Sequence, residues 1–243
     1  MPDAKHTHSE RRAVIMAGGE GTRLRPFTQT IPKPLLPLGR KPIAQIIVER
    51  LRDCGITEIT MTLGYAAELI RAFFQTGSQF GVRVSYFQEP SRMGTAGCLA
   101  HIPELRVAPF LVSNGDILTD LDYCAFLQEH EASDAVLSVA TRSENVAIPY
   151  GVLRLDGARV LGVEEKPCMN YCFNAGIYAV STTCLGLIPT DRPFDMTDLI
   201  NALLAAGHAV RSVPLEGLWF DLARVDDFEK ALAQIEKTHP HLL

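Results

Sequence analysis

The chain has no long apolar run, no paired cysteine motif and no excess of positive charge, and each absence excludes a class of protein. None of its apolar stretches approaches the roughly 20 residues of a membrane-spanning helix. Six scattered cysteines without a Cys-x-x-Cys spacing favour free thiols in a reducing compartment over a metal site. With 23 basic and 28 acidic residues the net charge is −5, so nucleic acid is not an expected partner. We expect a cytoplasmic protein with no membrane partner.

The composition fits one globular domain behind a short leader. Residues 1–10, MPDAKHTHSE, are polar and lack the apolar core of a signal peptide, so we predict a disordered leader there. Residues 11–243 contain no linker, internal repeat or low-complexity segment, and 47% of the chain is hydrophobic, enough for a sizeable core. We therefore expect a single domain with two halves, 11–135 and 136–243.

Predicted strands alternate with predicted helices through the first half, whereas closely spaced strands dominate the second. This order indicates an α/β protein, a Rossmann-like three-layer sandwich with a mixed, mainly parallel central sheet. An Asp156-Gly157 turn is expected to join two of the later strands. The expected strands are 12–17, 58–63, 82–87, 110–113, 135–141, 151–155, 160–164 and 174–180, and the expected helices 42–54, 66–74, 95–101, 122–130, 196–206 and 226–237.

Residues 17–42, AGGEGTRLRPFTQTIPKPLLPLGRKP, combine four glycines with five prolines directly after the first predicted strand. Glycines let main-chain N–H groups approach a ligand closely, and successive N–H groups bind anions well. Prolines restrict the backbone on both sides of Lys33, which stands between Pro32 and Pro34. The stretch therefore predicts a phosphate site with a cation directed towards it.

Two common phosphate motifs do not fit this loop. The P-loop requires Gly-Lys-Ser or Gly-Lys-Thr, and neither occurs in the chain. A dinucleotide-binding Gly-x-Gly-x-x-Gly could begin at Gly19, but Leu24 occupies the third glycine position, and prolines follow instead of a helix.

The full string Gly-Gly-x-Gly-Thr-Arg-Leu-x-Pro-x-Thr, followed by Pro-Lys-Pro-Leu-Leu-Pro, resembles the signature of the sugar-1-phosphate nucleotidylyltransferases, and most closely the short, single-domain guanylyltransferase-like members. The resemblance implies the nucleotide-diphospho-sugar transferase fold, with a nucleotide-binding first half and a sugar-phosphate-binding second half. It continues through Met93-Gly94-Thr95-Ala96-Gly97, Asn114-Gly115-Asp116, Tyr150-Gly151, Glu164-Glu165-Lys166-Pro167, Phe173-Asn174-Ala175-Gly176 and Trp219-Phe220-Asp221.

The resemblance also implies a role for each matching residue, with an NTP and a sugar 1-phosphate as partners and Mg²⁺ as cofactor. Catalytic roles fall to Arg23, Lys33, Asp116 and Lys166, and metal binding to Asp116 and Asp221. Nucleotide binding falls to Ala17, Gly18, Gly19, Gly21, Thr22, Arg23, Gly94, Thr95 and Ala96, and sugar-phosphate binding to Gly151, Glu165, Lys166 and Asn174.

The chemistry agrees with these residue types. A phosphate oxygen attacks the α-phosphorus and expels pyrophosphate, so the site needs alignment and charge compensation but no general base. Mg²⁺ suits it because this ion takes one or two carboxylates and completes its shell with phosphate oxygens and water. Asn174 lies in an apolar strand and is expected to be buried with partners. The family's glycine after the second acid is replaced here by Ala223, which restricts the backbone next to Asp221.

Several alternatives remain open. The small residues from Gly94 to Gly97 favour GTP, read by main-chain groups, but uridylyl and thymidylyl transfer are alternatives. A non-catalytic regulatory subunit that binds a nucleotide sugar is another, as is a glycosyltransferase with Asp120-Leu121-Asp122 as its metal pair. A homo-oligomer is compatible with the sequence. We expect Phe73-Phe74 in the core, and the histidines at 101, 130 and 208 exposed or at element ends. In the main interpretation, the acids at 120, 122, 226 and 227 are turn and cap residues.

Overall fold

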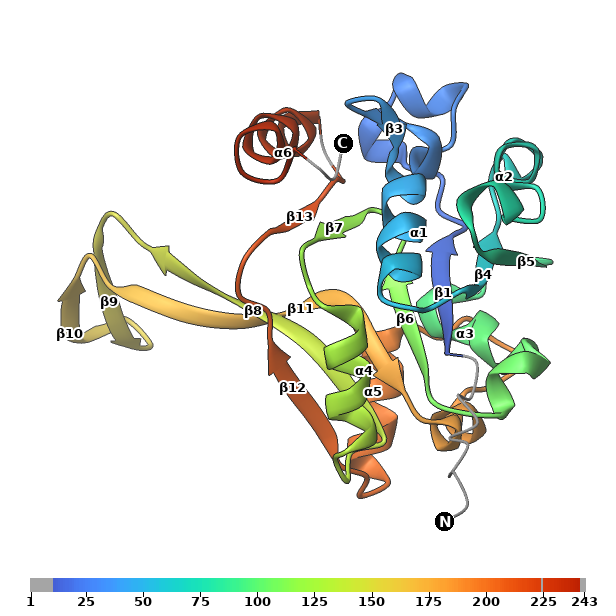
Figure 1. Ribbon diagram of the computed structural model, residues 1–243. Helices are drawn as coiled ribbons and strands as arrows, with labels where there is room; N and C mark the ends of the chain where they lie inside the picture. Colours follow the sequence, from blue (N-terminus) through green and yellow to red (C-terminus); the bar gives the residue numbers. More distant parts are fainter. Residues whose placement is uncertain (1–10, 224, 241–243) are drawn as a thin grey trace, which may run out of the picture.

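The computed structural model describes residues 11–223 and 225–240, and the predicted leader at 1–10 lies outside them. A seven-stranded sheet forms its centre, in the order β12-β8-β11-β6-β1-β4-β5 (Figure 1). Four neighbouring pairs are parallel, and only β11 runs antiparallel to both of its neighbours. The strands are β1 (Arg12–Ala17), β4 (Glu58–Leu63), β5 (Arg83–Gln88), β6 (Phe110–Asn114), β8 (Leu137–Ala147), β11 (Cys168–Val180) and β12 (Val210–Pro214).

Helices cover both faces of this sheet. Alternate residues of β1 point to opposite faces, so Ala13 and Ile15 enter one hydrophobic cluster and Val14 enters the other. The first cluster includes side chains of α1, α2, α4 and α6, and the second includes those of α3 and α5. The predicted α/β fold with a mixed, mainly parallel sheet is therefore confirmed. The helices are α1 (Ile43–Asp53), α2 (Ala67–Phe74), α3 (Gly94–Gly97), α4 (Tyr123–Glu131), α5 (Met196–Ala205) and α6 (Val225–Thr238).

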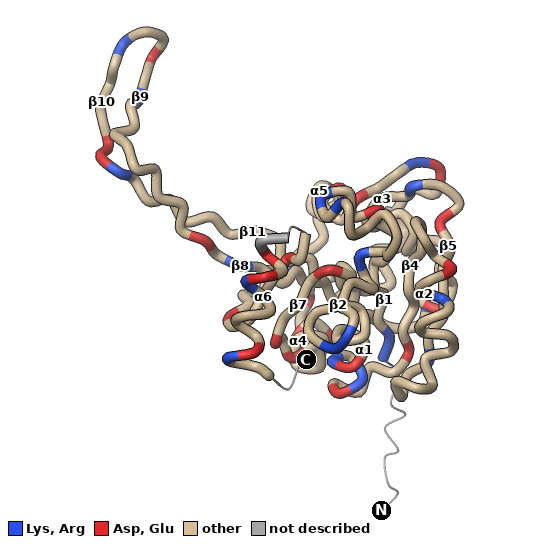
Figure 2. The backbone as a smooth tube through the Cα atoms, turned by 90° about the horizontal axis from the view of Figure 1, so that it is seen from above, with Lys and Arg blue, Asp and Glu red and all other residues tan. Residues whose placement is uncertain are grey.

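Two strands of the sheet are much longer than the sequence predicts. Beyond residue 141, β8 and β11 leave the sheet as a twisted ribbon that ends in the hairpin of β9 (Gly151–Asp156) and β10 (Arg159–Glu165). Figures 1 and 2 show this ribbon projecting well away from the core, and we name residues 142–173 the arm. The predicted turn at Asp156-Gly157 is confirmed, because Asp156 pairs with Arg159 across it.

Two short strands place the ends of two distant segments side by side. β7 (Ile117–Thr119) pairs antiparallel with β13 (Trp219–Asp221), and this pairing sets Asp221 opposite Ile117. A second small ladder joins β2 (Pro37–Leu38) to β3 (Lys41–Pro42) immediately before α1. Within the described residues, no helix has the length and apolar character that a membrane crossing requires.

Local capping and core predictions agree with the structure at two places. Asp122 caps α4, because its carboxylate accepts hydrogen bonds from the N–H groups of Cys124 and Ala125, each at 2.9 Å. Phe74 is fully buried, and its ring lies 4.9 Å from that of Phe73 between centroids. Both phenylalanines therefore belong to the core side of α2, as expected.

His130 lies at an element end, as expected, but its side chain is buried. It stands in the last turn of α4, which packs against β6 and β11, and Ser138 of β8 lies against its ring. Its two ring nitrogens lie 2.9 Å from the Ser138 hydroxyl and 3.0 Å from the Ser181 hydroxyl. Burial, with a smaller contribution from Arg211, lowers the pKa of His130.

This burial predicts a pH dependence of stability. Because the folded pKa of His130 lies below its unfolded value, the neutral ring stabilises the fold at high pH. That contribution is lost as pH falls through the unfolded pKa towards the folded one. Between about pH 7 and 5, the melting temperature of the wild type should fall more steeply than that of His130→Gln. Parallel slopes in thermal melts of the two proteins would contradict this assignment.

Candidate functional site

The glycine loop at the C-terminal end of β1 forms the floor of a pocket of about 590 Å³. The loop passes so close to Gly64 that a Cβ on Gly64 would stand 2.5 Å from the Gly18 carbonyl oxygen. A Cβ on Gly18 would stand 2.7 Å from a carboxylate oxygen of Glu89. Gly21 has a φ of +62° and turns the chain into a 3₁₀ helix over Thr22–Leu24. Glycine is therefore required for the shape of this pocket.

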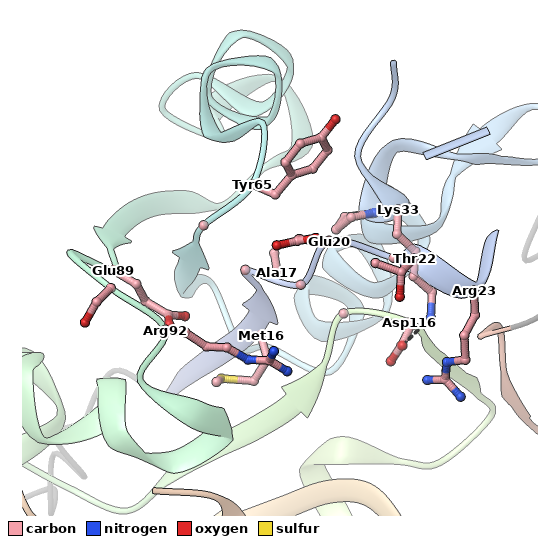
Figure 3. A pocket seen from close by; sticks show the side chains of 17 residues that line it. Met16, Ala17, Glu20, Thr22, Arg23, Lys33, Tyr65, Glu89, Arg92 and Asp116 are labelled. Atoms are coloured by element: carbon pink, nitrogen blue, oxygen red, sulfur yellow. Dashed lines mark hydrogen bonds and ion pairs between the residues drawn. The ribbon is translucent and has the colours of Figure 1, made fainter. Parts of the chain in front are cut away.

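The pocket gathers most of the residues predicted to bind the nucleotide. Figure 3 shows Arg23, Lys33 and Asp116 at one end of it, and Glu89 and Arg92 at the other. The predicted residues that line it are Ala17, Gly18, Gly19, Gly21, Thr22, Arg23, Lys33 and Asp116.

Lys33 is the buried cation of the site. Its exposure is only 8%, and its ammonium group forms an ion pair with the carboxylate of Asp116. Pro32 is extended, and Lys33 and Pro34 begin a 3₁₀ helix, so the prolines fix the direction of the lysine as the sequence predicts. A buried lysine is rare without a partner, and here the partner is itself a predicted metal ligand.

Asp116 and Asp221 lie side by side although 105 positions separate them in the sequence. The β7–β13 ladder brings them together, and the Leu222 N–H donates a hydrogen bond of 3.0 Å to the Asp116 carbonyl oxygen. Asp221 thus lies beside Asp116 with Ala223 at the position where the resembling family has glycine.

The surroundings of the Asp221 carboxylate disfavour its negative charge. Its Oδ1 is buried and has no hydrogen-bond partner among the described residues. Burial first, and then the charge of Asp116, raise the pKa of Asp221, while Lys33 and Arg23 act in the opposite direction. An unpaired carboxylate oxygen beside a second carboxylate fits a hard divalent cation, with the remaining coordination positions left for phosphate and water.

Sequence reasoning missed the residues at the other end of the pocket, above all Glu89. One Glu89 oxygen accepts a hydrogen bond from the Met93 N–H at 3.1 Å, and burial raises the pKa of this carboxyl. Tyr65 also lines the pocket, and its hydroxyl donates to the Gln29 carbonyl across the mouth of the loop at 2.9 Å. The rule that ligands bind at the carboxyl ends of parallel strands could have found Glu89, because β5 ends at Gln88.

The predicted base-binding segment Gly94–Gly97 does not line this pocket, and three of its four amides have other acceptors. The Thr95 N–H donates to Asp195 at 2.8 Å, and the Ala96 and Gly97 N–H groups donate to the Phe194 carbonyl at 2.9 Å. The segment is therefore fixed to the residues just before α5, and its Met93 N–H contacts Glu89 at the pocket.

The predicted sugar-phosphate residues do not line the pocket, and the structure does not bring all four together. Gly151, Glu165 and Lys166 lie at the hairpin end of the arm, whereas Asn174 lies at its inner end, six positions beyond Cys168 along β11, which is on the order of 20 Å. Gly151 pairs with Glu165, and the Lys166 N–H donates to the Tyr150 carbonyl at 3.2 Å. Asn174 was expected to be buried, but it is exposed, because a register shift in β11 turns it outward. Its amide group donates to the Tyr178 hydroxyl at 2.6 Å, and its Oδ1 accepts from the Gly176 N–H at 2.9 Å.

The carboxylates of the alternative Asp120-Leu121-Asp122 motif have structural roles. Asp120 accepts a hydrogen bond from the Leu218 N–H at 2.9 Å and lies 3.5 Å from His239, and Asp122 caps α4. The glycosyltransferase alternative therefore loses the feature that suggested it.

Comparison with known proteins identifies the family of this chain. A family model described as "Nucleotidyl transferase" matches residues 12–238. The UTP–glucose-1-phosphate uridylyltransferase of Synechocystis sp. is 31% identical over 241 residues, which cover 91% of this chain and 62% of that protein. The mannose-1-phosphate guanylyltransferase catalytic subunit beta of Danio rerio is 32% identical over 225 residues, which cover 89% and 62%.

A solved structure shares the whole architecture. HddC from Yersinia pseudotuberculosis, complexed with GMP-PN, has a TM-score of 0.70 and 25% identity, and the match covers 93% of this chain and 99% of that one. The chain spans less than two thirds of the length of the two curated relatives above. With a family model matched from the first strand to the last helix, this chain belongs to the nucleotidyl transferase family.

Proposed function

We propose that this chain transfers a nucleoside monophosphate from an NTP to a sugar 1-phosphate and releases pyrophosphate. The observation that carries the proposal is the group formed by Lys33, Asp116 and Asp221 at the end of the glycine-loop pocket. The relatives named above support the same reaction class, because their names specify nucleotidyl transfer to glucose 1-phosphate or mannose 1-phosphate.

The acidic, basic and main-chain groups of the pocket have different proposed roles. Asp116 and Asp221 would hold Mg²⁺, which supplies charge neutralisation on the phosphate oxygens. The glycine loop brings main-chain N–H groups to the triphosphate, and Arg23 and Lys33 add cations where charge builds up on the transferring phosphorus. Since the attacking group is already a phosphate oxygen, the residues act through alignment and electrostatics.

The acceptor side of the proposal rests on the arm. Lys166 has a φ of +48°, a left-handed conformation that costs a non-glycine residue roughly 1–2 kcal/mol. Strain of this kind is retained mostly where a side chain must point in a particular direction. We infer that Lys166 holds the phosphate of the sugar 1-phosphate, and that Glu165 and Gly151 border the sugar. Asn174, predicted to border it as well, lies too far along β11 to contact the same sugar in this conformation.

Glu89 favours GTP as the donor. It stands at the end of the pocket opposite Lys33, where the base of a bound NTP would lie (Figure 3). A carboxylate only accepts hydrogen bonds, and guanine presents two adjacent donors, its ring N–H and its amino group. Uracil and thymine present one donor flanked by two carbonyl oxygens, which a carboxylate repels. The relative that is named a uridylyltransferase keeps UTP as the alternative.

The reaction itself is tested by pyrophosphate release over four NTPs and a panel of sugar 1-phosphates. Asp116→Asn should lower turnover by at least about a hundredfold, because an amide of similar shape cannot supply the carboxylate. Asp122→Asn makes the same chemical change at a helix cap, where asparagine serves equally well, and should leave turnover unchanged. A folded Asp116→Asn protein that retains more than about a tenth of wild-type activity at saturating Mg²⁺ would refute metal ligation.

The choice of base is tested separately by Glu89→Gln. Glutamine replaces the negative carboxylate with a neutral amide that has only one acceptor oxygen. The kcat/KM for GTP should therefore fall about ten- to a hundredfold, and the kcat/KM for UTP should change little or rise. Glu68→Gln, an exposed position on α2, is the matched control. If UTP or dTTP already exceeds GTP with the wild type, the guanylyl proposal is wrong while the reaction class stands.

A further inference from the structure

Residues 22–31, which we name the strap, are held to the rest of the molecule by few contacts. The strap follows the glycine loop and carries Arg23 along the wall of the pocket (Figure 3). Of its residues, only Leu24 and Thr28 are buried, and the ring of Phe27 is 56% exposed. A segment that buries so little apolar surface opens at a low cost in free energy. The contacts that do hold the strap therefore decide whether Arg23 stays in place.

Thr28 fixes the inner side of the strap to the glycine loop. Its hydroxyl donates a hydrogen bond of 2.8 Å to the Gly21 carbonyl oxygen, which also accepts the Leu24 N–H at 2.9 Å. A Cβ on Gly21 would stand 2.9 Å from the Thr28 methyl group, so the two residues are in close contact. The Leu24 side chain belongs to the larger hydrophobic cluster of the core. The part of the strap nearest the glycine loop is therefore anchored to that loop and to the core.

Tyr65 holds the outer part of the strap. This residue follows β4 and lines the pocket, and its hydroxyl donates a hydrogen bond of 2.9 Å to the Gln29 carbonyl oxygen (Figure 3). Its own N–H donates a weak hydrogen bond of 3.4 Å to the Gly18 carbonyl oxygen, so Tyr65 is also tied to the glycine loop. Within the part of the chain that the structure describes, the bond to Gln29 is the only hydrogen bond between the strap and any residue beyond position 33.

We propose that Tyr65 is a positioning residue of the NTP site, whose hydroxyl holds the strap closed so that Arg23 stays beside the pocket. Arg23 lies in the 3₁₀ helix at the start of the strap, and release of the Gln29 carbonyl frees the other end of the same segment. A ligand that requires the closed strap binds more weakly in proportion as the closed fraction falls. The identity of that ligand as an NTP rests on the proposed function.

Limited digestion with chymotrypsin, without substrate, measures the opening of the strap. Phe27 begins a 3₁₀ helix that ends at Gln29, so cleavage after Phe27 requires this turn to unwind. Tyr65→Phe keeps the ring and removes the hydroxyl, and cleavage at this bond should be about two- to tenfold faster than in the wild type, as for the loss of one neutral hydrogen bond. In Tyr86→Phe the same change removes a 2.6 Å hydrogen bond to the Gln75 carbonyl, away from the pocket, and cleavage after Phe27 should not change. Mass spectrometry of the fragments identifies the bond.

Steady-state kinetics with the NTP that the wild type accepts best test the consequence for binding. In Tyr65→Phe the KM for this NTP should rise about two- to tenfold, because part of the binding free energy is used to close the strap. The KM for the sugar 1-phosphate should stay at the wild-type value, since its proposed site lies on the arm. A loss of folded protein would instead lower the apparent kcat and leave both KM values unchanged. Circular dichroism melts confirm that each variant is folded, and Tyr65→Met replaces Tyr65→Phe should that variant not fold.

Each outcome decides the proposal. Equal rates of cleavage after Phe27 in the wild type and in Tyr65→Phe overturn it, and so does an equal acceleration in Tyr86→Phe. Faster cleavage in Tyr65→Phe without a rise in the KM for the NTP overturns the positioning role. Digestion is measured without turnover, so a wild type that is inactive with every NTP refutes the proposed function, while the digestion still decides whether Tyr65 holds the strap.

Discussion

The β7–β13 ladder holds two carboxylates, Asp116 and Asp221, side by side. Their like charges repel each other, and the neighbouring groups of the site compensate this repulsion only in part. The main-chain hydrogen bond from Leu222 to Asp116 fixes their backbones, so the side chains cannot separate freely. Lys33 is buried against Asp116 and offsets part of the charge, but Oδ1 of Asp221 still has no partner among the described residues. A fold retains such an arrangement at a cost in stability, and a bound cation would relieve it.

The rest of the pocket is built from backbone and from cations. The contact of Gly18 with Gly64 leaves no room for side chains where phosphates would lie, and the buried Lys33 and the nearby Arg23 stand beside that space. At the opposite end, Glu89 is braced by the Met93 N–H, and the 93–97 segment is in turn fixed on Phe194 and Asp195. The residues just before α5 thus support the Glu89 end of the pocket through this segment, without entering it.

The sequence predicted the parts that depend on local patterns. The glycine loop, the directed Lys33, the order of strands and helices and the cap at Asp122 all follow from residues that are close together in the chain. It failed at Asn174, which turns outward at a register shift in β11 that no local pattern marks. The partners of His130 and of the Thr95 to Gly97 amides also come from distant segments, which the sequence pattern does not reveal. The outer hairpin was predicted, but the extension of β8 and β11 through residues 142–147 and 168–173 was missed, because these exposed residues show no buried-strand pattern.

The central claim is most directly tested by the stability of Asp221→Asn with and without Mg²⁺. Ionised Asp221 costs stability because burial and Asp116 raise its pKa in the fold, and this cost disappears as pH falls through that raised pKa. In EDTA at neutral pH, Asp221→Asn should therefore melt about 2 °C or more above the wild type, and the difference should shrink on acidification. Saturating Mg²⁺ should raise the wild-type melting temperature and leave that of the variant nearly unchanged. A variant that melts below the wild type in EDTA and gains as much from Mg²⁺ would contradict a shared carboxylate metal site.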